Sequence, residues 1–306
     1  MTEWDLPRVG LITIWYQASR EMDRFVTALR ALQYARLQPV FVIHQQTQDE
    51  VAWLSREVPL ALIEQPGGNL GTAAGWNLGI VRLLEQDVDY VGIWNVDVRL
   101  DPESVKRLVA VMEKDGTIGA CQPLLLYSDE PNKVEMYGGS MDVRTGQGEH
   151  DYKGATDLSS LPPLRDTGYL DGGTMMVRAD VLRRVGGFDE SFFMYAEDSD
   201  LSLRIQKAGY RTVAIRDARA WHYHRENCGA FPTPHQLFYE TRNRFYLVRK
   251  HAGERARTHL VMESIGDIQR PVAHFLRRRK PALAWAYVTG VLSGATGRTG
   301  AQTWVS

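Results

Sequence analysis

The 306-residue sequence has few cysteines, no excess of charge of either sign and no apolar run long enough to cross a membrane. Its two cysteines, Cys121 and Cys228, lie far apart without metal-like spacing, so neither a disulfide framework nor a zinc site is predicted. A net charge of -1 gives no reason to expect nucleic acid as a partner. Residues 1–5 are acidic and have no apolar h-region, which argues against a secretory signal and favours the cytoplasm.

The near-neutral total conceals a basic C-terminal region. From Glu240 to the end the chain has twelve Lys or Arg and four Asp or Glu. Residues 277–280 are three Arg and one Lys, and the apolar segment 282–292 behind them is too short to span a bilayer. We expect a helical extension over residues 236–306, which either contacts the inner face of the membrane peripherally or simply packs on the body.

The first 235 residues have the pattern of an α/β domain. Residues 9–16 and 40–43 are apolar, β-branched runs typical of buried strands, and residues 22–37 between them have helical spacing. A strand, a helix and a strand in this order predict a βαβ unit and a mostly parallel, Rossmann-like sheet flanked by helices. Ligands lie beyond the carboxyl ends of such strands, so Tyr16, Gln17 and His44 are either nucleotide contacts or ordinary loop residues.

A helix over residues 48–57 and a short strand over 60–63 lead to a glycine-rich segment, residues 67–80. Small residues allow the backbone to approach a ligand closely, and the helix that follows offers free N–H groups to an anion. The pattern is neither a Walker loop nor a dinucleotide fingerprint, so alone it is a weak signal. The candidate donor-binding residues in this segment are Asn69, Gly71, Gly75 and Asn77.

The strand predicted over residues 89–94 runs into Asn95-Val96-Asp97. In an extended segment, residues two apart point the same way, so Asn95 and Asp97 would present oxygens together at the end of the strand. Such oxygens suit Mg²⁺ or Mn²⁺ shared with phosphates, although a turn at the end of the strand would explain them without a metal. His222, near the end of a later strand, is a second candidate metal ligand, whereas a single His is usually structural.

Residues 116–164 are rich in Gly, Asp, Pro and Ser and contain only weak strands, such as 121–127. We expect this loop-rich region to shape an acceptor site. The segment Asp171-Gly172-Gly173 then forms a glycine turn that enters a strand, and a helix follows over residues 179–185. Gly172 and Gly173 are therefore candidate acceptor-binding residues.

The stretch from Gly186 to Arg204 is the most informative in the chain. A double glycine and a run of aromatics precede three carboxylates in four positions, Glu197, Asp198 and Asp200, which open a helical pattern. Capping by Asp198 or Ser199, with the acids complementing the helix dipole, is one explanation. The other is catalysis, since carboxylates held against apolar walls have raised pKa values that suit a general base near neutral pH.

Together these residues resemble the family 2 glycosyltransferases of GT-A fold, in particular the rhamnosyltransferase-like branch. The resemblance covers roughly residues 8 to 250 and is most specific in its second half. The matching stretches, in chain order, are Asn69-x-Gly71 with Gly75-x-Asn77-x-Gly79, Asn95-x-Asp97 in place of the family's Asp-x-Asp, Gly186-Gly187-Phe188-Asp189-Glu190 with Glu197-Asp198-x-Asp200-Leu201, and Ala218 to His222.

The resemblance implies transfer of a sugar, rhamnose or a similar hexose, from a dTDP- or UDP-sugar to an acceptor hydroxyl, with inversion. Asp198 matches the family's base, Glu197 would support it or touch the acceptor, and Asp200 belongs to the acceptor side. Asp97 would hold Mg²⁺ or Mn²⁺ on the diphosphate, and His222 would complete the metal shell. The acceptor would be a glycan, a lipid-linked molecule or a small molecule, in the synthesis of a polysaccharide or glycoconjugate.

Two segments depart from the family's pattern. Where the family has Tyr-Asn this chain has Tyr16-Gln17, and where it has an Asp-rich turn this chain has His44-Gln45-Gln46. The nucleotide is therefore not identified by the resemblance. The competing hypothesis is a non-catalytic protein that binds a glycan or a nucleotide on the same fold; a nucleotidyltransferase is disfavoured because no basic, glycine-rich pyrophosphate loop occurs near the N-terminus.

Overall fold

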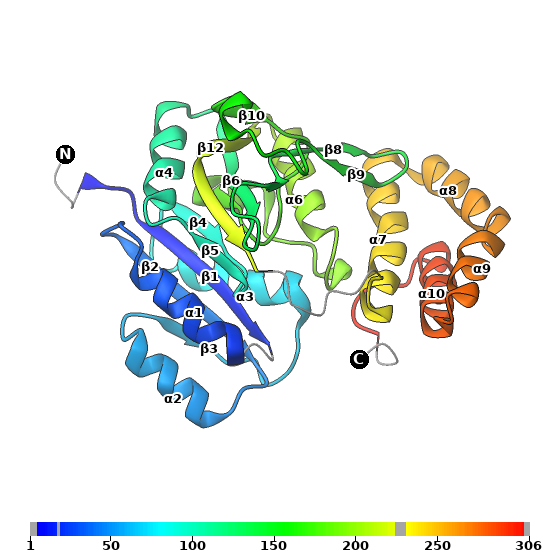
Figure 1. Cartoon of the computed structure of the whole chain (residues 1–306), viewed down its shortest axis with the longest axis horizontal. Coiled ribbons are helices and arrows are strands. Elements are labelled where there is room, and N and C mark those ends of the chain that lie inside the picture. Colours follow the sequence, from blue (N-terminus) through cyan, green and yellow to red (C-terminus); the bar gives the residue numbers. More distant parts are fainter. Residues whose placement is uncertain (1–4, 17–18, 224–230, 303–306) are drawn as a thin grey trace.

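The computed structural model describes residues 5–16, 19–223 and 231–302, in which a twisted sheet packs between two layers of helices (Figure 1). The sheet has the strand order β10-β12-β6-β11-β4-β1-β2-β3, with β5 paired to β12 and β7 paired to β6. Its strands are β1 (Val9–Tyr16), β2 (Leu37–His44), β3 (Leu62–Glu64), β4 (Tyr90–Ile93), β5 (Val98–Leu100), β6 (Ile118–Tyr127), β7 (Val134–Met136), β10 (Leu164–Asp166), β11 (Met176–Arg178) and β12 (Arg211–His222). A separate hairpin consists of β8 (Gly139–Asp142) and β9 (Gln147–His150).

Three helices cover each face of the sheet. The helices are α1 (Ser19–Arg30), α2 (Gln48–Glu57), α3 (Gly71–Leu84), α4 (Ser104–Lys114), α5 (Ala179–Val185), α6 (Glu197–Lys207), α7 (Pro234–Ala252), α8 (Glu254–Gly266), α9 (Gln269–Arg277) and α10 (Pro281–Thr296). Leu11 of β1 packs into an apolar cluster with α1, α2 and α4, whereas the next residue, Ile12, packs into a second cluster with α3, α5 and α6. This alternation follows from the two-residue period of a strand.

Strand direction places the ends of several strands at one edge. The strands β3, β2, β1 and β4 are mutually parallel, β11 is antiparallel to β4 and β6, and β12 is parallel to β6. The carboxyl ends of β1, β2, β4 and β12 therefore lie at the same edge of the sheet, together with the start of β11. The predicted α/β class with a βαβ start is confirmed, and the candidate site residues gather at this edge.

Several predicted boundaries were wrong. The helix expected over 22–37 ends at Arg30, because residues 31–36 form a turn and the strand already begins at Leu37. Pro39 lies inside β2, which is tolerated because β3 pairs with β2 only from Val40 onward. Residues 121–127, expected to be a weak strand, belong to the ten-residue strand β6, of which all but the last residue are buried.

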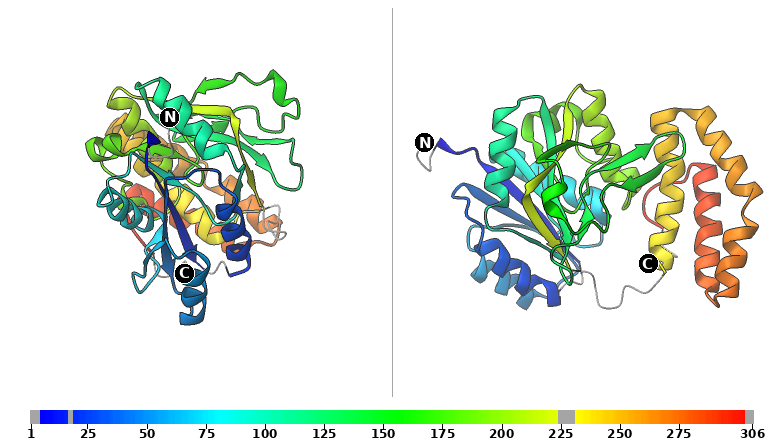
Figure 2. Two further views of the ribbon diagram at one scale, coloured as in Figure 1. Left: turned by 90° about the vertical axis from the view of Figure 1, so that its left-hand side faces the viewer. Right: turned by 45° about the horizontal axis from the view of Figure 1, so that its top comes forward.

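The four C-terminal helices pack beside the sheet, as Figure 1 and the right-hand view of Figure 2 show. Helices α7 and α10 approach closely at Gly290 and Gly294, where a Cβ atom would lie 2.9 Å from Thr241 Cβ and 2.3 Å from Phe245 Cδ2. Within the described residues, no helix is both long and apolar enough to cross a membrane. The domain division at residues 235 and 236 stays a prediction; α7 begins at Pro234 and packs directly on residues 193–195, just before α6.

Candidate active site

The ends of β1 and β2 form one side of the site. Tyr16, the last residue of β1, has 38% of its surface exposed, and its ring lies 6.5 Å from that of His44, the last residue of β2. His44 is buried, and its Nε2 has no hydrogen-bond partner among the described residues. Burial lowers the pKa of His44, so the imidazole is neutral. Gln17, also expected to contact the donor, lies outside the described residues.

The start of α3 joins this side to residues 193–196, the turn that precedes α6. Asn69 Oδ1 accepts a hydrogen bond from the N–H of Gly71. Gly71 has a φ of +77°, and a Cβ at this position would lie 2.4 Å from the carbonyl oxygen of Phe193. That carbonyl accepts hydrogen bonds from the N–H of Ala73 and from Thr72 Oγ1. Only glycine allows this approach of the two backbones.

Gly75 and Asn77 lie inside α3 rather than in the loop that the sequence predicted. A Cβ at Gly75 would lie 2.8 Å from Ile14 Cδ1 and 3.2 Å from His44 Cε1, so the glycine allows the helix to pack against the sheet. The Asn77 amide donates to the carbonyl of Phe188 and accepts from its N–H. These contacts give both residues a structural role, and donor contact by either stays a prediction.

The turn before α6 has an unusual backbone. Phe193, Tyr195 and Ala196 are non-glycine residues with φ of 65°, 65° and 69°. Each such residue costs about 1–3 kcal/mol, and such strain is found mainly at functional sites. Ala196 occupies the N-cap position and makes no side-chain cap, so the N-cap predicted at Asp198 or Ser199 is wrong, although the acids do lie in the first turn, where they complement the helix dipole. Glu197 and Asp198 instead form the first turn of α6.

Glu197 and Asp198 are both held by specific donors. Glu197 is buried; its Oε1 accepts from Thr72 Oγ1 at 2.6 Å, and its Oε2 has no partner among the described residues. Asp198 accepts backbone N–H groups from Ser199 at 2.6 Å and from Gly172 at 3.1 Å. Burial raises the pKa of both carboxyls, with Asp198 adding to the effect on Glu197 and Asp171 to that on Asp198.

The loop before β11 supports these carboxylates. Gly172 and Gly173 are buried, and Cβ atoms there would lie 2.9 Å from Asp198 Cβ and 2.6 Å from Asn95 Nδ2. The double glycine thus brings the loop against both residues, and acceptor contact by either glycine stays a prediction. Asp171, which the sequence analysis missed, accepts the N–H of Gly173, and burial raises its pKa.

Asn95 and Asp97 lie in a turn after β4, not in the extended segment that was expected. The N–H of Val98 bonds to the carbonyl of Asn95 across this turn. Asp97 Oδ2 lies 3.5 Å from His222 Nε2, and Asp97 Oδ1 is buried without a partner among the described residues.

His222 lies between two carboxylates. Its Nδ1 lies 3.0 Å from Oε1 of Glu135, a residue of β7 that the sequence did not indicate. Burial alone would lower the pKa of His222, but hydrogen bonds to Asp97 and Glu135 raise it to about 10. No group of three or more His, Cys, Asp or Glu side chains arranged to hold a metal ion occurs in the described part of the chain.

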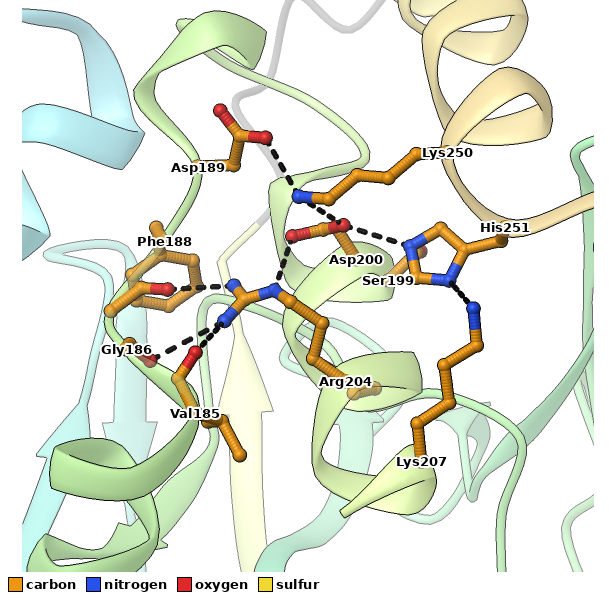
Figure 3. Close-up of polar contacts among 12 residues, drawn as sticks. Val185, Gly186, Phe188, Asp189, Ser199, Asp200, Arg204, Lys207, Lys250 and His251 are labelled. Carbon is orange, nitrogen blue, oxygen red and sulfur yellow. Dashed lines mark hydrogen bonds and ion pairs between the residues drawn. The ribbon is translucent and has the colours of Figure 1, made fainter. Parts of the chain in front are cut away.

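Asp200 was expected on the acceptor side, and this expectation is wrong. Its carboxylate is fully buried and lies between Lys250 Nζ at 2.8 Å, His251 Nε2 at 2.8 Å and Arg204 Nε at 2.7 Å (Figure 3). Burial alone would raise its pKa, but hydrogen bonds from His251 and Lys250 and the charge of Arg204 lower it to about 2. Asp200 therefore joins α6 to α7, and its side chain has no exposed surface that an acceptor could contact.

A model described as glycosyl transferase family group 2 matches residues 95–248, just over half of the chain. The chain belongs to this family and is a glycosyltransferase. The matched residues include the turn formed by residues 192–196, the loop before β11 and most of α7.

Two relatives are rhamnosyltransferases. The N-acetylglucosaminyl-diphospho-decaprenol L-rhamnosyltransferase of Mycobacterium tuberculosis is 27% identical over 263 residues, covering 79% of this chain and 85% of that protein. Rhamnosyltransferase WbbL of Escherichia coli is 26% identical over 196 residues, covering 60% of this chain and 72% of that protein.

Solved structures show that the fold is GT-A. GalNAc-T7 with UDP, GalNAc and Mn²⁺ aligns with a TM-score of 0.61 and 12% identity, covering 98% of this chain and 56% of the other. The mannosyltransferase of Pyrobaculum calidifontis with GDP-Man and Mn²⁺ aligns with a TM-score of 0.58 and 13% identity, covering 95% of this chain and 88% of the other. Both neighbours bind a nucleotide or nucleotide sugar together with Mn²⁺.

The structural role of Asp200 predicts a pH-dependent loss of stability in Asp200→Asn. This variant removes the buried carboxylate that Arg204, Lys250 and His251 share, so its free energy of unfolding at neutral pH should be about 3 kcal/mol lower. Because the folded-state pKa of Asp200 is about 2, below the value of about 4 in an unfolded chain, wild type loses this contribution as pH falls from about 4 to about 2. Urea denaturation of both proteins across this range measures the difference.

Asp217→Asn is the matched control, because Asp217 forms an exposed ion pair with Arg216. It should change the free energy of unfolding by at most about 1 kcal/mol at any pH. A constant difference between wild type and Asp200→Asn down to pH 2 would contradict the proposed ion-pair role.

Proposed function

We propose that this protein is an inverting glycosyltransferase that transfers a deoxyhexose or hexose from a nucleoside diphosphate sugar to an acceptor hydroxyl in polysaccharide or glycoconjugate synthesis. The observation that carries the proposal is the pair formed by the buried Glu197 and the half-buried Asp198 directly after a strained turn, at the edge where the parallel strands end. The rhamnosyltransferase relatives support a 6-deoxyhexose such as rhamnose as the sugar.

Asp198 is the proposed general base. Hydrogen bonds from the N–H groups of Ser199 and Gly172 fix the carboxylate, and its raised pKa makes it a stronger base than an exposed Asp. It would take the proton of the acceptor hydroxyl as that oxygen attacks the anomeric carbon from the side opposite the leaving diphosphate. A single in-line displacement inverts the anomeric configuration.

Glu197 has a different role in this proposal. Its Oε1 is held by Thr72, while its buried Oε2 has no partner among the described residues. Its pKa is raised by burial and by the neighbouring Asp198. A state in which the two carboxyls share one proton is therefore favoured over a state in which both are ionised. A protonated Glu197 can donate a hydrogen bond to a sugar hydroxyl while Asp198 stays ionised.

Asp97 and His222 are the proposed protein ligands of a divalent ion, which on binding would displace the Nε2 proton that the raised pKa of His222 retains. The two side chains lie 3.5 Å apart, and the buried Asp97 Oδ1 has no hydrogen-bond partner among the described residues. One or two protein ligands suffice for Mg²⁺ when phosphates supply others, and Mn²⁺ accepts the same oxygens. When bound, the metal would offset the negative charge of the diphosphate leaving group. Glu135, bonded to His222 Nδ1, would orient the imidazole so that Nε2 faces the ion.

The exposed surface of the C-terminal helices supports peripheral contact with the cytoplasmic face of a membrane. Leu276 and Trp285 have 53% and 63% of their surface exposed, and the basic residues 277–280 between them are all exposed. Basic residues beside apolar anchors match the chemistry of an anionic bilayer. A lipid-linked acceptor, as the name of the mycobacterial relative states for that protein, would be reached from this surface.

The first test replaces the proposed base. Asp198→Asn keeps the shape of the side chain but cannot accept the proton, so kcat should fall by roughly 10²–10⁴-fold. Donor affinity, measured by calorimetric titration of a nucleoside diphosphate, should stay unchanged. The matched variant Glu197→Gln keeps a hydrogen-bond donor and should retain more activity than Asp198→Asn. Near-normal turnover of Asp198→Asn would remove this residue from the role.

The second test concerns the metal. In Asp97→Ala, the affinity for a nucleoside diphosphate should fall when Mn²⁺ is present, because the ion loses a protein ligand. With chelator present, the same variant should bind at least as tightly as wild type, since the carboxylate then only repels the phosphates. Titration of both proteins under both conditions measures the sign. Equal affinities in Mn²⁺ would show that residues 95–97 are only a turn, and Asp217→Ala serves as the control.

The third test concerns the membrane. The protein should co-sediment with phosphatidylglycerol vesicles and should stay in the supernatant with phosphatidylcholine vesicles. Arg277→Ala should weaken binding about five-fold, which corresponds to about 1 kcal/mol per basic residue at an anionic surface. Trp285→Ala should also weaken binding, whereas Leu60→Ala, which removes an equally exposed apolar side chain outside the C-terminal helices, should not. Equal binding of all variants would contradict this surface.

A further inference from the structure

One face of α7 lies against the catalytic turn and is unusually polar for a buried surface. Its residues recur at helical spacing and contact residues 189–200 by side chain; they are Tyr239, Arg242, Asn243, Tyr246 and Lys250. Arg242 and Asn243 are almost completely buried, with 1% and 0% of their surfaces exposed. Buried polar side chains of this kind are retained at a cost unless they make specific hydrogen bonds.

Asn243 makes these bonds with the turn itself. Its Nδ2 donates to the carbonyl oxygens of Phe192 at 3.0 Å, Met194 at 2.7 Å and Tyr195 at 2.7 Å. The two N–H groups of one amide thus serve three carbonyls in four consecutive residues, with one N–H shared between two of them. The last of these carbonyls belongs to Tyr195, two residues before Glu197.

Arg242 fixes the orientation of this amide. Its Nε donates to Asn243 Oδ1 at 2.8 Å, so the amide nitrogen must face the turn. Its Nη2 donates to the carbonyl of Phe192 at 2.7 Å, and its Nη1 to the carbonyl of Gly300. The guanidinium also lies over the ring of Tyr239, 4.6 Å from its centroid, and that ring stacks on Phe193. The two neighbouring side chains therefore act as one unit.

The turn needs such support because its own backbone does not favour this conformation. Phe193, Tyr195 and Ala196 have positive φ, a region that side chains other than glycine avoid. On the other side, the carbonyl of Phe193 accepts from Thr72 Oγ1 and from the N–H of Ala73. The carbonyls of Met194 and Tyr195 receive their hydrogen bonds from Asn243 on the α7 side.

We propose that Asn243, oriented by Arg242, is a positioning residue that holds residues 192–196 in the strained conformation and thereby sets Glu197 and Asp198 in their catalytic geometry. The proposal rests on the transferase function given above, because it assigns Asn243 to the placement of the general base. Asn243 touches neither substrate nor metal. Its effect on the reaction passes through the turn alone.

The test is Asn243→Asp, which keeps the shape and the bond from Arg242 but replaces the donor with oxygens that repel the three carbonyls. With the base displaced, kcat should fall about 10²-fold, as small misplacements of a catalytic group do. The dissociation constant for a nucleoside diphosphate should stay unchanged, because the ends of β1, β2 and β4 are intact. Amide hydrogen exchange in residues 193–198 should become faster.

Val291→Ala is the matched control. Val291 is completely buried between α7 and α10 beside Phe245 and Val248, so its truncation destabilises the same helices without touching the turn. At an equal loss of Tm it should keep its kcat and its slow exchange in residues 193–198. If Asn243→Asp does not fold, Asn243→Ala, which buries no charge, carries the same test.

The outcomes separate the two proposals. Faster exchange at the turn in an Asn243 variant, together with a wild type that transfers no sugar, would keep the positioning role and overturn the transferase function. An active wild type and an Asn243 variant with kcat and exchange like those of Val291→Ala would overturn the positioning role and keep the function.

Discussion

The backbone of residues 192–196 is the constraint on which the rest of the site depends. The carbonyl of Phe193 receives hydrogen bonds from the start of α3, and the carbonyls of Phe192, Met194 and Tyr195 receive them from α7. The glycine at position 71 and the close approach of α3 to the sheet follow from the same geometry. Two elements from distant parts of the sequence, α3 and α7, therefore converge on five residues, and α6 begins where they end.

The second constraint is the concentration of negative charge beyond this turn. Asp171 lies close enough to Asp198 to raise its pKa, and Asp97 and Glu135 flank His222. In a region with little water, carboxylates at such distances favour partial protonation or the recruitment of cations. A diphosphate brought into this region needs positive charge beside it. The same crowding thus favours both the proposed base and the proposed divalent ion.

Local signals in the sequence predicted the elements whose ends are marked chemically. Residues 48–57 form a helix as predicted, because Thr47 and Glu50 form a capping box, and the helix over 179–185 ends at Gly186 with a φ of +81°. Gly75, in contrast, was interpreted as part of a ligand loop, although it allows a helix to lie close to His44. Glycine permits both arrangements, so sequence alone does not distinguish them. The roles of Glu135, Asp171 and Asn243 require contacts between distant segments, for which the sequence has no local signal.

The three acids of the opening turn of α6 show how one helix separates catalysis from structure. Asp198 and Asp200 are two residues apart, so their side chains leave the helix in nearly opposite directions. Asp198 faces Asp171 without a cation bonded to it among the described residues, and its pKa is raised by burial and by that charge. Asp200 faces Arg204, Lys250 and His251, which lower its pKa. Residue type and spacing are the same for a base and for a structural anion, and only the partners that the fold brings to each side of the helix decide which acid can accept a proton near neutral pH.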